Sequence, residues 1–325
     1  MAQLNSTTVT SNISSSPGDS PHPSLDSSGL VPALVMSICF LLGFPGNIAV
    51  IIVKPNWENM SSLSQSLMLS LAVSDLLCLV TLPLWIYSFL YGWTFRLVGC
   101  KIITYFVYCS LYASLLTVTV LSVQRYLQVV HLQRSLNRVK ARVLLVPLWL
   151  ASMILSTPAL VFRQLSEDQR WTTCSNQYSA EGQRMAVVLT ETLVGFVSLS
   201  VIVFSYINLY RKVNQAAFFN NPQTTRLITS ITVTLVVLWM PYLVINIISV
   251  AAISLKNEGL VKFSHDIRDT VAAIVFVNSA LNPLLYAFTS NRLSSLCHKS
   301  AQRFIQKFRI SQTMSTALTT EEATQ

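Results

Sequence analysis

Seven long apolar stretches divide this chain, and each is long enough to cross a lipid bilayer as a helix. A spanning helix needs about 20 mostly apolar residues. The composition agrees, because only 11% of the residues are charged, whereas about a quarter are charged in an ordinary soluble domain. We therefore expect an all-α membrane protein, a seven-transmembrane helix bundle. The expected spans are residues 30–53, 63–89, 98–130, 141–163, 186–212, 225–253 and 266–289.

Two of these stretches contain a proline beside polar groups that a bilayer disfavours. Pro241 follows closely after Trp239 in the sixth stretch, and Pro283 directly follows Asn282 in the seventh. A proline inside a helix frees a backbone carbonyl and kinks the helix, which is tolerated in a membrane only where neighbours or water satisfy that carbonyl. We interpret both prolines as hinges of a bundle that changes shape.

The basic residues near the helix ends lie on one side of the predicted membrane, and this asymmetry marks the cytoplasmic side. The N-terminus is then extracellular and the C-terminus cytoplasmic, as in a multi-pass protein of the plasma membrane. The basic residues behind the net charge of +9 are therefore expected near the anionic lipids of the inner leaflet. No stripe of basic and aromatic residues points to a nucleic-acid partner. The residues are Lys54, Arg134, Arg138, Lys140, Arg142, Arg211, Lys212, Arg226, Arg292, Lys299, Arg303, Lys307 and Arg309.

Four segments follow from this topology. Residues 1–29 form a disordered extracellular tail, in which Asn5 and Asn12 are acceptors for N-glycosylation; this tail lacks the basic start of a cleavable signal peptide. Residues 30–290 form the bundle. Residues 291–310 have the pattern of a short amphipathic helix on the inner membrane surface, where Cys297 is either S-palmitoylated or a free thiol. Residues 311–325 form a disordered cytoplasmic tail rich in Ser and Thr.

Two cysteines fall on the extracellular side. Cys100 begins the third span, and Cys174 lies in the loop between the fourth and fifth spans. The oxidising environment outside the cell favours a disulfide between them.

Asp75 is an ionisable residue in the middle of the second span, where a charge is costly and therefore indicates a function. Its expected neighbours are Asn47 of the first span, Ser114 of the third, and Asn278, Ser279 and Asn282 of the seventh. Together these groups form a candidate cation site. Alternatively, Asp75 is protonated and only holds helices together by hydrogen bonds.

Several charges fall in the outer half of the predicted bundle. Arg163, Arg184 and Arg268 flank Glu191 of the fifth span, and convergent arginines favour an anionic ligand because guanidinium pairs well with carboxylate. Loop charges that merely mark the water boundary are the alternative. The aromatic residues that are expected to line an apolar pocket are Tyr105, Tyr108, Tyr112, Trp239 and Tyr242. Packing between helices or a place in the interfacial aromatic belt is the alternative for each of them.

The ordered series of motifs resembles a rhodopsin-like (class A) G-protein-coupled receptor over residues 30–310. No single motif is sufficient, but their order along the chain is specific. The matching residues are Gly46-Asn47, Leu71-Ala72-Val73-Ser74-Asp75, Cys100, Arg125-Tyr126, Trp149, Tyr206, Trp239-Met240-Pro241 and Asn282-Pro283-Leu284-Leu285-Tyr286.

Within that family the chain looks most like the leukotriene B4 receptors of the chemoattractant group. The stretches that carry this likeness are Tyr112-Ala113-Ser114, residues 157–163, Glu181-Gly182-Gln183-Arg184, Glu191 with Gly195-Phe196, and Trp239-Met240-Pro241-Tyr242 with Asn246. The resemblance implies a lipid chemoattractant as agonist, either leukotriene B4 or a related hydroxylated fatty acid. It also implies that the ligand's carboxylate and hydroxyls are met by Arg163, Arg184, Glu191, Tyr242 and Arg268. Tyr108, Tyr112 and Trp239 of the expected aromatic pocket complete the candidate ligand-binding residues.

The resemblance further implies how such a receptor signals. An agonist shifts the population toward an active state by its differential affinity for that state, and the sixth helix moves about Pro241. The residues of the implied switch are Arg125, Tyr126, Tyr206, Trp239, Pro241, Pro283 and Tyr286. The expected partners are a heterotrimeric G protein of the Gi type and, at the phosphorylated tail, a receptor kinase and arrestin. No cofactor is expected apart from an allosteric sodium ion at Asp75.

Three positions depart from the family pattern. Gln124 replaces the acidic residue that usually precedes the arginine, so Arg125 loses a charge partner and we expect raised basal signalling. Leu199 replaces the usual proline of the fifth span, so that helix is expected to lack its bulge. Thr104 stands where leukotriene receptors often carry histidine, which leaves the identity of the ligand open.

Two other classes of membrane protein are weighed against a lipid receptor. A receptor for a peptide chemoattractant, of the formyl-peptide or chemokine type, would use the acidic tail and the loop that contains Cys174. A secondary transporter would show inverted repeats and paired broken helices, and no such symmetry is evident. The chain is not expected to be an enzyme, because it shows no metal-ligand spacing or nucleophile motif.

Overall fold

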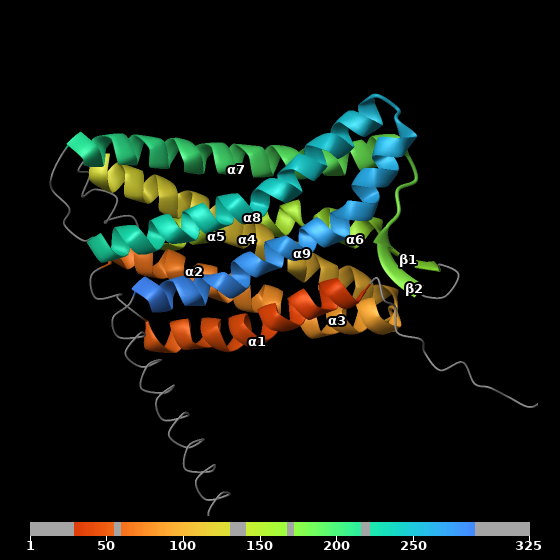
Figure 1. The fold of residues 1–325 in the computed structure, drawn as a ribbon, viewed down its shortest axis with the longest axis horizontal. Helices are drawn as coiled ribbons and strands as arrows, with labels where there is room; N and C mark the ends of the chain where they lie inside the picture. Colours follow the sequence, from red (N-terminus) through yellow and green to blue (C-terminus); the bar gives the residue numbers. More distant parts are fainter. Residues whose placement is uncertain (1–28, 55–59, 131–140, 168–171, 216–221, 290–325) are drawn as a thin grey trace, which may run out of the picture.

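The structure is a computed structural model, and it describes residues 29–54, 60–130, 141–167, 172–215 and 222–289. Within these ranges the chain forms an elongated bundle of helices that run roughly along one axis (Figure 1). The helices are α1 (Leu30–Val53), α2 (Ser62–Leu79), α3 (Leu82–Tyr91), α4 (Leu97–Val130), α5 (Ala141–Leu155), α6 (Thr157–Phe162), α7 (Glu181–Gln215), α8 (Pro222–Ser254) and α9 (Glu258–Thr289).

Proline explains why two expected spans each consist of two helices. The second span is α2 followed by α3, which has Pro83 in its first turn. The fourth span is α5 followed by α6, with Pro158 in its first turn. Proline has no N–H to donate to the preceding turn and is favoured where a helix starts. Both spans therefore break at the residues just before the proline.

The membrane class follows from the helices themselves. In the described part of the chain, 6 helical segments are long and apolar enough to cross a membrane. The last long helix, α9, runs beside α1 and α8 in the same bundle (Figure 1). With α9, the described bundle contains the seven helical passes that the sequence predicts.

The two hinge prolines lie inside unbroken helices. Pro241 is within α8 and Pro283 is within α9. The fifth span, α7, is one continuous helix through Leu199, as expected for a helix in which leucine replaces the family's usual proline.

Helix α1 packs very closely against α9. A Cβ atom added to Gly46 would lie 2.7 Å from Cβ of Pro283, and one added to Gly43 would lie 2.8 Å from Cα of Ala280. Real side chains essentially never approach so closely, so glycine is required at these two positions. The second proline hinge is therefore held directly against the first helix.

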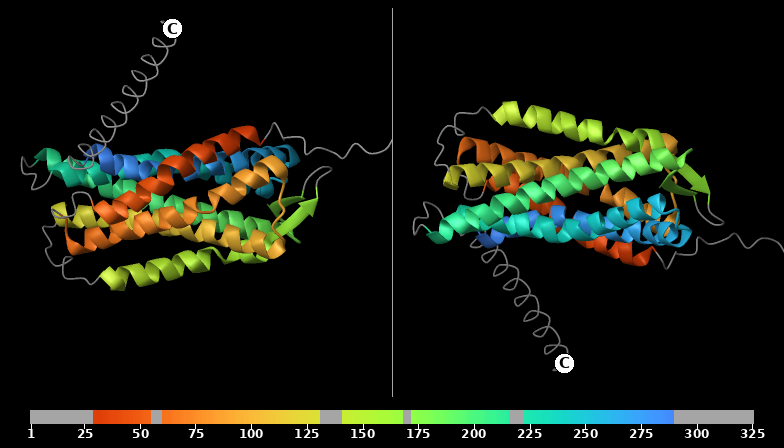
Figure 2. Two further views of the ribbon diagram at one scale, coloured as in Figure 1. Left: turned by 90° about the horizontal axis from the view of Figure 1, so that it is seen from below. Right: turned by 90° about the horizontal axis from the view of Figure 1, so that it is seen from above.

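A two-stranded antiparallel hairpin lies in the loop between the fourth and fifth spans, where the sequence reading expects only a loop. Strand β1 (Arg163–Glu167) pairs with β2 (Thr172–Asn176), and Leu165 lies opposite Cys174. Figure 2 shows the hairpin at one end of the bundle, the end where α8 turns into α9. A Cys100–Cys174 disulfide ties β2 to the start of α4, which confirms the predicted bridge.

Several predictions concern residues outside the described ranges. They are the glycosylated tail with Asn5 and Asn12, the amphipathic helix at 291–310 with Cys297, and the cytoplasmic tail at 311–325. These stay predictions.

Candidate functional site

The main cavity opens within the outer half of the bundle, the half next to the hairpin, and has a volume of about 200 Å³. Its walls are mostly apolar and aromatic, and its polar groups include Arg163 and Glu191. Ligand sites of small molecules commonly have this composition. The lining residues are Met36, Trp85, Ser88, Phe89, Thr104, Val107, Tyr108, Leu111, Tyr112, Arg163, Thr173, Cys174, Glu191, Trp239, Tyr242, Ala272, Val275 and Phe276.

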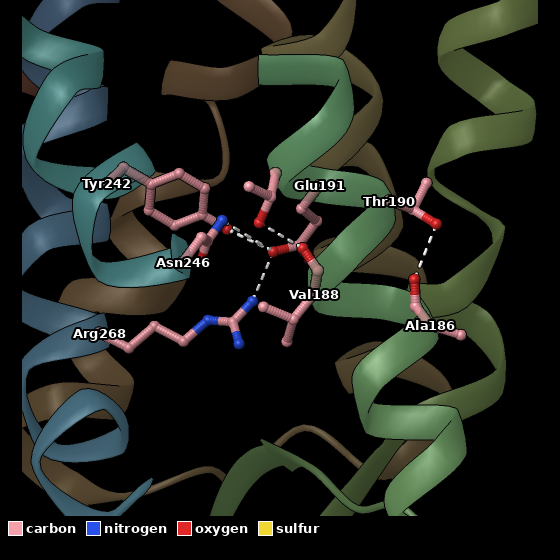
Figure 3. Close-up of polar contacts among 8 residues, drawn as sticks. Ala186, Val188, Thr190, Glu191, Tyr242, Asn246 and Arg268 are labelled. Carbon is pink, nitrogen blue, oxygen red and sulfur yellow. Dashed lines mark hydrogen bonds and ion pairs between the residues drawn. The ribbon is translucent and has the colours of Figure 1, made fainter. Parts of the chain in front are cut away.

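Glu191 is the polar centre of this region, and its side chain joins three helices (Figure 3). Its Oε2 atom accepts hydrogen bonds from Tyr242 Oη at 2.9 Å and from Asn246 Nδ2 at 3.4 Å, both on α8. The same atom accepts from Arg268 Nη2 of α9 at 2.6 Å. Glu191 is only 8% exposed, so the carboxylate depends on these donors for its stabilisation.

The pair formed by Glu191 and Arg268 is a largely buried salt bridge, with side-chain exposures of 7% and 18%. Removing one partner of such a pair leaves an uncompensated buried charge, which typically costs about 3 to 5 kcal/mol. Arg268 is therefore neutralised by a carboxylate of the protein itself.

A second, outer cavity of about 530 Å³ lies next to the main cavity and shares Arg163 and Cys174 with it. Arg163, Arg184 and Arg268 all line it. Arg163 Nη1 donates to the backbone carbonyl of Cys174 at 2.8 Å, which anchors this arginine to β2. The three arginines that the sequence singled out thus converge on one space.

The expected ligand residues divide between the two cavities. Tyr108, Tyr112, Trp239 and Tyr242 line the main cavity together with Arg163 and Glu191, whereas Arg184 and Arg268 line the outer one. The ring of Trp239 lies edge-on to that of Tyr242, with 6.1 Å between the centroids. Thr104, at the departure from the family pattern, is buried in the wall of the main cavity. Tyr105 is not among the residues that line either cavity.

Asp75 lies at the buried junction of α2, α4 and α9, with 0% exposure. Asn282 Nδ2 donates to its Oδ2 atom at 2.7 Å, and Ser114 Oγ donates to its Oδ1 atom at 3.5 Å. Nearby, Asn47 Nδ2 donates to the backbone carbonyl of Ser279 at 3.0 Å. The second, third and seventh spans are therefore connected by polar contacts beside Pro283.

The buried amide oxygens around Asp75 suit a cation. The Oδ1 atoms of Asn47, Asn278 and Asn282 are buried and accept no hydrogen bond within the described part of the chain. Of these residues, Asn282 contacts Asp75 directly, and its amide oxygen, the Asp75 carboxylate and the Ser114 hydroxyl are hard oxygen donors of the kind that hard cations prefer. A site with one carboxylate fits a monovalent ion such as sodium better than a divalent one.

At the opposite end of the bundle, Gln124 and Arg125 point to different partners. Gln124 Nε2 donates to Ser61 Oγ at 3.1 Å, and Ser61 also caps the N-terminus of α2 by accepting from the backbone N–H of Ser64. Arg125 Nη1 donates to Gln128 Oε1 at 3.4 Å. The Nε and Nη2 atoms of Arg125 are buried and have no hydrogen-bond partner among the described residues. Gln124 therefore holds α4 to α2, and Arg125 has no carboxylate partner in the part of the chain that the structure describes.

The other switch residues lie near this end. Thr232 Oγ1 of α8 donates to Tyr206 Oη of α7 at 3.2 Å, and Tyr206 is near enough to Arg125 to interact with it electrostatically. The ring of Tyr126 lies edge-on to that of Phe204. Tyr286 belongs to α9, but its side chain is outside the described set.

Asn246, Tyr178 and Ser61 are among the residues of these sites that the sequence does not single out as functional candidates. Asn246 was noted only as part of the family likeness, yet it donates to Glu191. Tyr178 lines the outer cavity, and Ser61 binds Gln124. For Asn246, the spacing of four residues from Tyr242 is a signal that the sequence did contain, because residues four apart share a helix face. Nothing in the local sequence pointed to Tyr178 or Ser61.

Comparison with known proteins agrees with this geometry. The profile of the 7 transmembrane receptor (rhodopsin family) matches residues 46–286. The chain is 30% identical to leukotriene B4 receptor 1 of Homo sapiens over 79% of this chain and 76% of that protein. It is 27% identical to C-X-C chemokine receptor type 2 of Oryctolagus cuniculus, over 83% of this chain and 78% of that receptor. It is 31% identical to apelin receptor B of Danio rerio, over 82% of this chain and 81% of that receptor.

The family match extends over most of the bundle, from the glycine in α1 that packs against Pro283 to the end of the seventh span. The chain therefore belongs to the rhodopsin family of seven-transmembrane receptors, multi-pass membrane proteins that respond to agonists through G proteins and are not enzymes.

Proposed function

We propose that this receptor is activated by an anionic, hydroxylated fatty acid, either leukotriene B4 or a related lipid chemoattractant. The observation that carries the proposal is the main cavity, which is apolar and aromatic but has Arg163 and Glu191 in its walls. The transfer of a hydrocarbon chain from water into such a cavity is favourable. Its carboxylate and hydroxyl groups need partners at one end.

The arginines make the site selective for a ligand with a negative charge. Arg184 and Arg163 line the outer cavity, and neither forms a salt bridge with an acidic residue within the described ranges. Arg268, in contrast, is compensated by Glu191. Glu181 also lines this cavity, but it forms no salt bridge with these arginines within the described ranges. A ligand carboxylate in the outer cavity can therefore pair with Arg163 or Arg184. The similarity to leukotriene B4 receptor 1 supports the same class of ligand.

A route from ligand to signal follows from the position of Glu191. Its hydrogen bond to Tyr242 reaches α8 one residue after Pro241, and the ring of Tyr242 touches that of Trp239. An agonist that changes these contacts has different affinities for the resting and the bent form of α8, and only such a difference shifts the population. Bending of α8 would then alter the contact between Tyr206 and Thr232 at the inner end.

Several further properties belong to this proposal. The N-terminus is extracellular and carries glycans at Asn5 and Asn12, and the C-terminus is cytoplasmic. The coupled G protein is of the Gi type, and the tail is phosphorylated by a receptor kinase and then bound by arrestin. A sodium ion at Asp75, Ser114, Asn278 and Asn282 stabilises the resting state. The receptor acts in chemotaxis at the plasma membrane.

A peptide chemoattractant is the second candidate for the agonist. In its favour, the outer cavity of about 530 Å³ adjoins another of about 480 Å³ lined by charged residues such as Lys262 and Glu258. The chain is also similar to a chemokine receptor and to an apelin receptor. A peptide would occupy this wide outer region more than the narrow main cavity.

Reversal of the charge at Arg163 separates the two candidates. Cells that express the wild type or Arg163→Glu at matched surface levels would be treated with hydroxylated eicosanoids and with chemotactic peptides. Inhibition of cyclic AMP formation and release of calcium are the readouts. We expect the wild type to respond to a hydroxylated fatty acid and the variant to lose that response. An intact lipid response in Arg163→Glu, or a wild-type response to peptides alone, would refute the proposed pocket.

A further inference from the structure

A small chamber lies behind the main cavity, between α4, α6 and α7. Its volume is about 20 Å³, and a space of about 10 to 15 Å³ by this measure is enough for one water molecule. The chamber therefore holds one oxygen-sized group but no carboxylate with its hydration shell. Its walls are mostly apolar, but several of its residues carry hydroxyl or carboxylate groups. They include Tyr108, Tyr112, Ser156, Tyr178, Thr190 and Glu191.

Tyr178 lines both the chamber and the outer cavity, and its hydroxyl group lacks a partner. Its Oη atom is buried and forms no hydrogen bond with any described residue. By contrast, the hydroxyl groups of Ser156 and Thr190, which also line the chamber, are hydrogen-bonded. They donate to the backbone carbonyls of Ser152 and Ala186, respectively. A buried polar group without a partner is a cost to the folded state. The Tyr178 hydroxyl is thus available for a hydrogen bond that the protein itself does not supply.

The surroundings fix this phenol in place and in its protonated form. The ring of Tyr178 packs against that of Phe162, with 5.1 Å between the centroids. Burial raises the pKa of Tyr178 to about 12, despite the opposing effect of Arg268 and Arg163. At physiological pH the group is therefore a neutral phenol that can both donate and accept one hydrogen bond.

The chamber shares Tyr108, Tyr112 and Glu191 with the main cavity. A group that branches from a ligand in the main cavity therefore reaches the chamber past these shared side chains. The chamber is too small for a second chain or a ring, so only a short polar branch fits.

We infer that the chamber is a subsite for a single hydroxyl group of the ligand and that Tyr178 is the residue that recognises it. This inference rests on the proposed function, because it assumes a hydroxylated lipid in the main cavity. It adds that the position of one hydroxyl along the ligand chain determines selectivity. A ligand hydroxyl in the chamber donates to or accepts from Tyr178 Oη and satisfies the group that is unpaired without ligand.

The test combines removal of the two hydroxyl groups, one from the protein and one from the ligand. Wild type and Tyr178→Phe would be assayed for G-protein activation with a hydroxylated fatty-acid agonist and with its analogue that lacks one hydroxyl. For the hydroxyl that enters the chamber, we expect Tyr178→Phe to lower the potency of the full agonist by about tenfold, which corresponds to about 1.4 kcal/mol. The potency of the analogue without that hydroxyl should not change.

Thermal unfolding of the ligand-free receptor separates recognition from a structural role. Because Tyr178→Phe removes an unpaired buried hydroxyl, the Tm of the ligand-free variant should equal or exceed that of the wild type. The matched control is Tyr105→Phe, which removes a phenol that lines none of the three cavities described above. This control should leave both potencies at the wild-type values.

The outcomes distinguish the inference from the function on which it rests. Equal losses of potency for the agonist and for every analogue, or a lowered Tm, would show that Tyr178 is structural and would overturn the inference. Unchanged potency for all ligands would overturn it as well. A wild-type receptor that responds to no hydroxylated fatty acid would instead contradict the proposed function itself.

Discussion

The guanidinium of Arg268 lies 2.6 Å from the carboxylate of Glu191, and this ion pair stands between the main cavity and the outer cavity of the receptor. Glu191 lines the main cavity, and Arg268 lines the outer one. The pair also connects α9 to α7, while Tyr242 and Asn246 connect the same carboxylate to α8. One buried charge pair thus sets the relative positions of the three helices around the site.

Replacement of Glu191 by Gln should destabilise the receptor more than replacement of both partners. Glu191→Gln alone leaves the largely buried Arg268 uncompensated, at a cost of about 3 to 5 kcal/mol. We expect a lower Tm for this variant, measured by thermal unfolding in detergent, and a partial recovery in Glu191→Gln/Arg268→Gln. If the double variant unfolds at a lower temperature than either single variant, the two side chains do not act as a pair.

Removal of the disulfide should affect both stability and ligand binding. The Cys100–Cys174 bridge closes a loop with a sequence separation of 74 residues, and the loss of such a constraint costs about 4 kcal/mol in the chain-entropy model. Cys174 also lines the main cavity and accepts from Arg163 through its carbonyl. Cys174→Ser should therefore lower the Tm and weaken agonist binding. The control is Cys39→Ser, which changes a buried cysteine of α1 that is not disulfide-bonded; equal effects of the two variants on agonist binding would contradict the role of the hairpin.

Sodium should lower agonist affinity through Asp75. If the ion occupies the oxygen donors at this junction and favours the resting state, agonist and sodium oppose each other. Coupling of this kind typically amounts to about 5-fold or more in affinity. We expect such a decrease in the wild type when sodium replaces a large organic cation at constant ionic strength. Asp75→Asn should bind agonist equally in both salts; a persistent sodium effect in that variant places the ion elsewhere.

Introduction of a carboxylate beside Arg125 should lower the basal signalling of the receptor. In the structure, Gln124 binds Ser61 and Arg125 has no acidic partner among the described residues. Gln124→Asp adds a charge that can hold Arg125 in the resting state, and a gain of about 1 kcal/mol would lower basal G-protein activation about fivefold. Gln124→Asn serves as the control, because it shortens the side chain to the same length without adding a charge. Basal activity that stays at the wild-type level in Gln124→Asp speaks against this account.

The sequence was sufficient for the features that depend on local composition and on long apolar runs. The bundle, the positions of Pro241 and Pro283 inside their helices and the Cys100–Cys174 bridge were all predicted. The approach of Asn282 to Asp75 was also expected, although the two residues are 207 positions apart. Charged and amide groups are rare in these apolar spans, and each is costly there without a polar partner, so the few that are present are expected to contact one another.

Features that depend on side-chain direction and on packing between helices were not predictable. The sequence placed three arginines near the ligand but did not show that Arg268 is already paired with Glu191. That pairing depends on the rotation of α7 and α9 about their axes. The breaks before Pro83 and Pro158 were missed because the apolar runs continue across them. The unpaired hydroxyl of Tyr178 becomes visible only when every neighbour is in place.

The most direct test of the central claim is saturation binding of a radiolabelled hydroxylated eicosanoid, such as leukotriene B4, to the purified receptor in lipid nanodiscs. The experiment would compare the wild type with Ala272→Trp, which fills the main cavity. We predict saturable binding to the wild type that is displaced by unlabelled lipid acid and is lost in the filled variant. Equal binding to both proteins, or no saturable lipid binding under conditions in which a chemotactic peptide binds the wild type, would contradict the claim that this cavity holds a fatty-acid agonist.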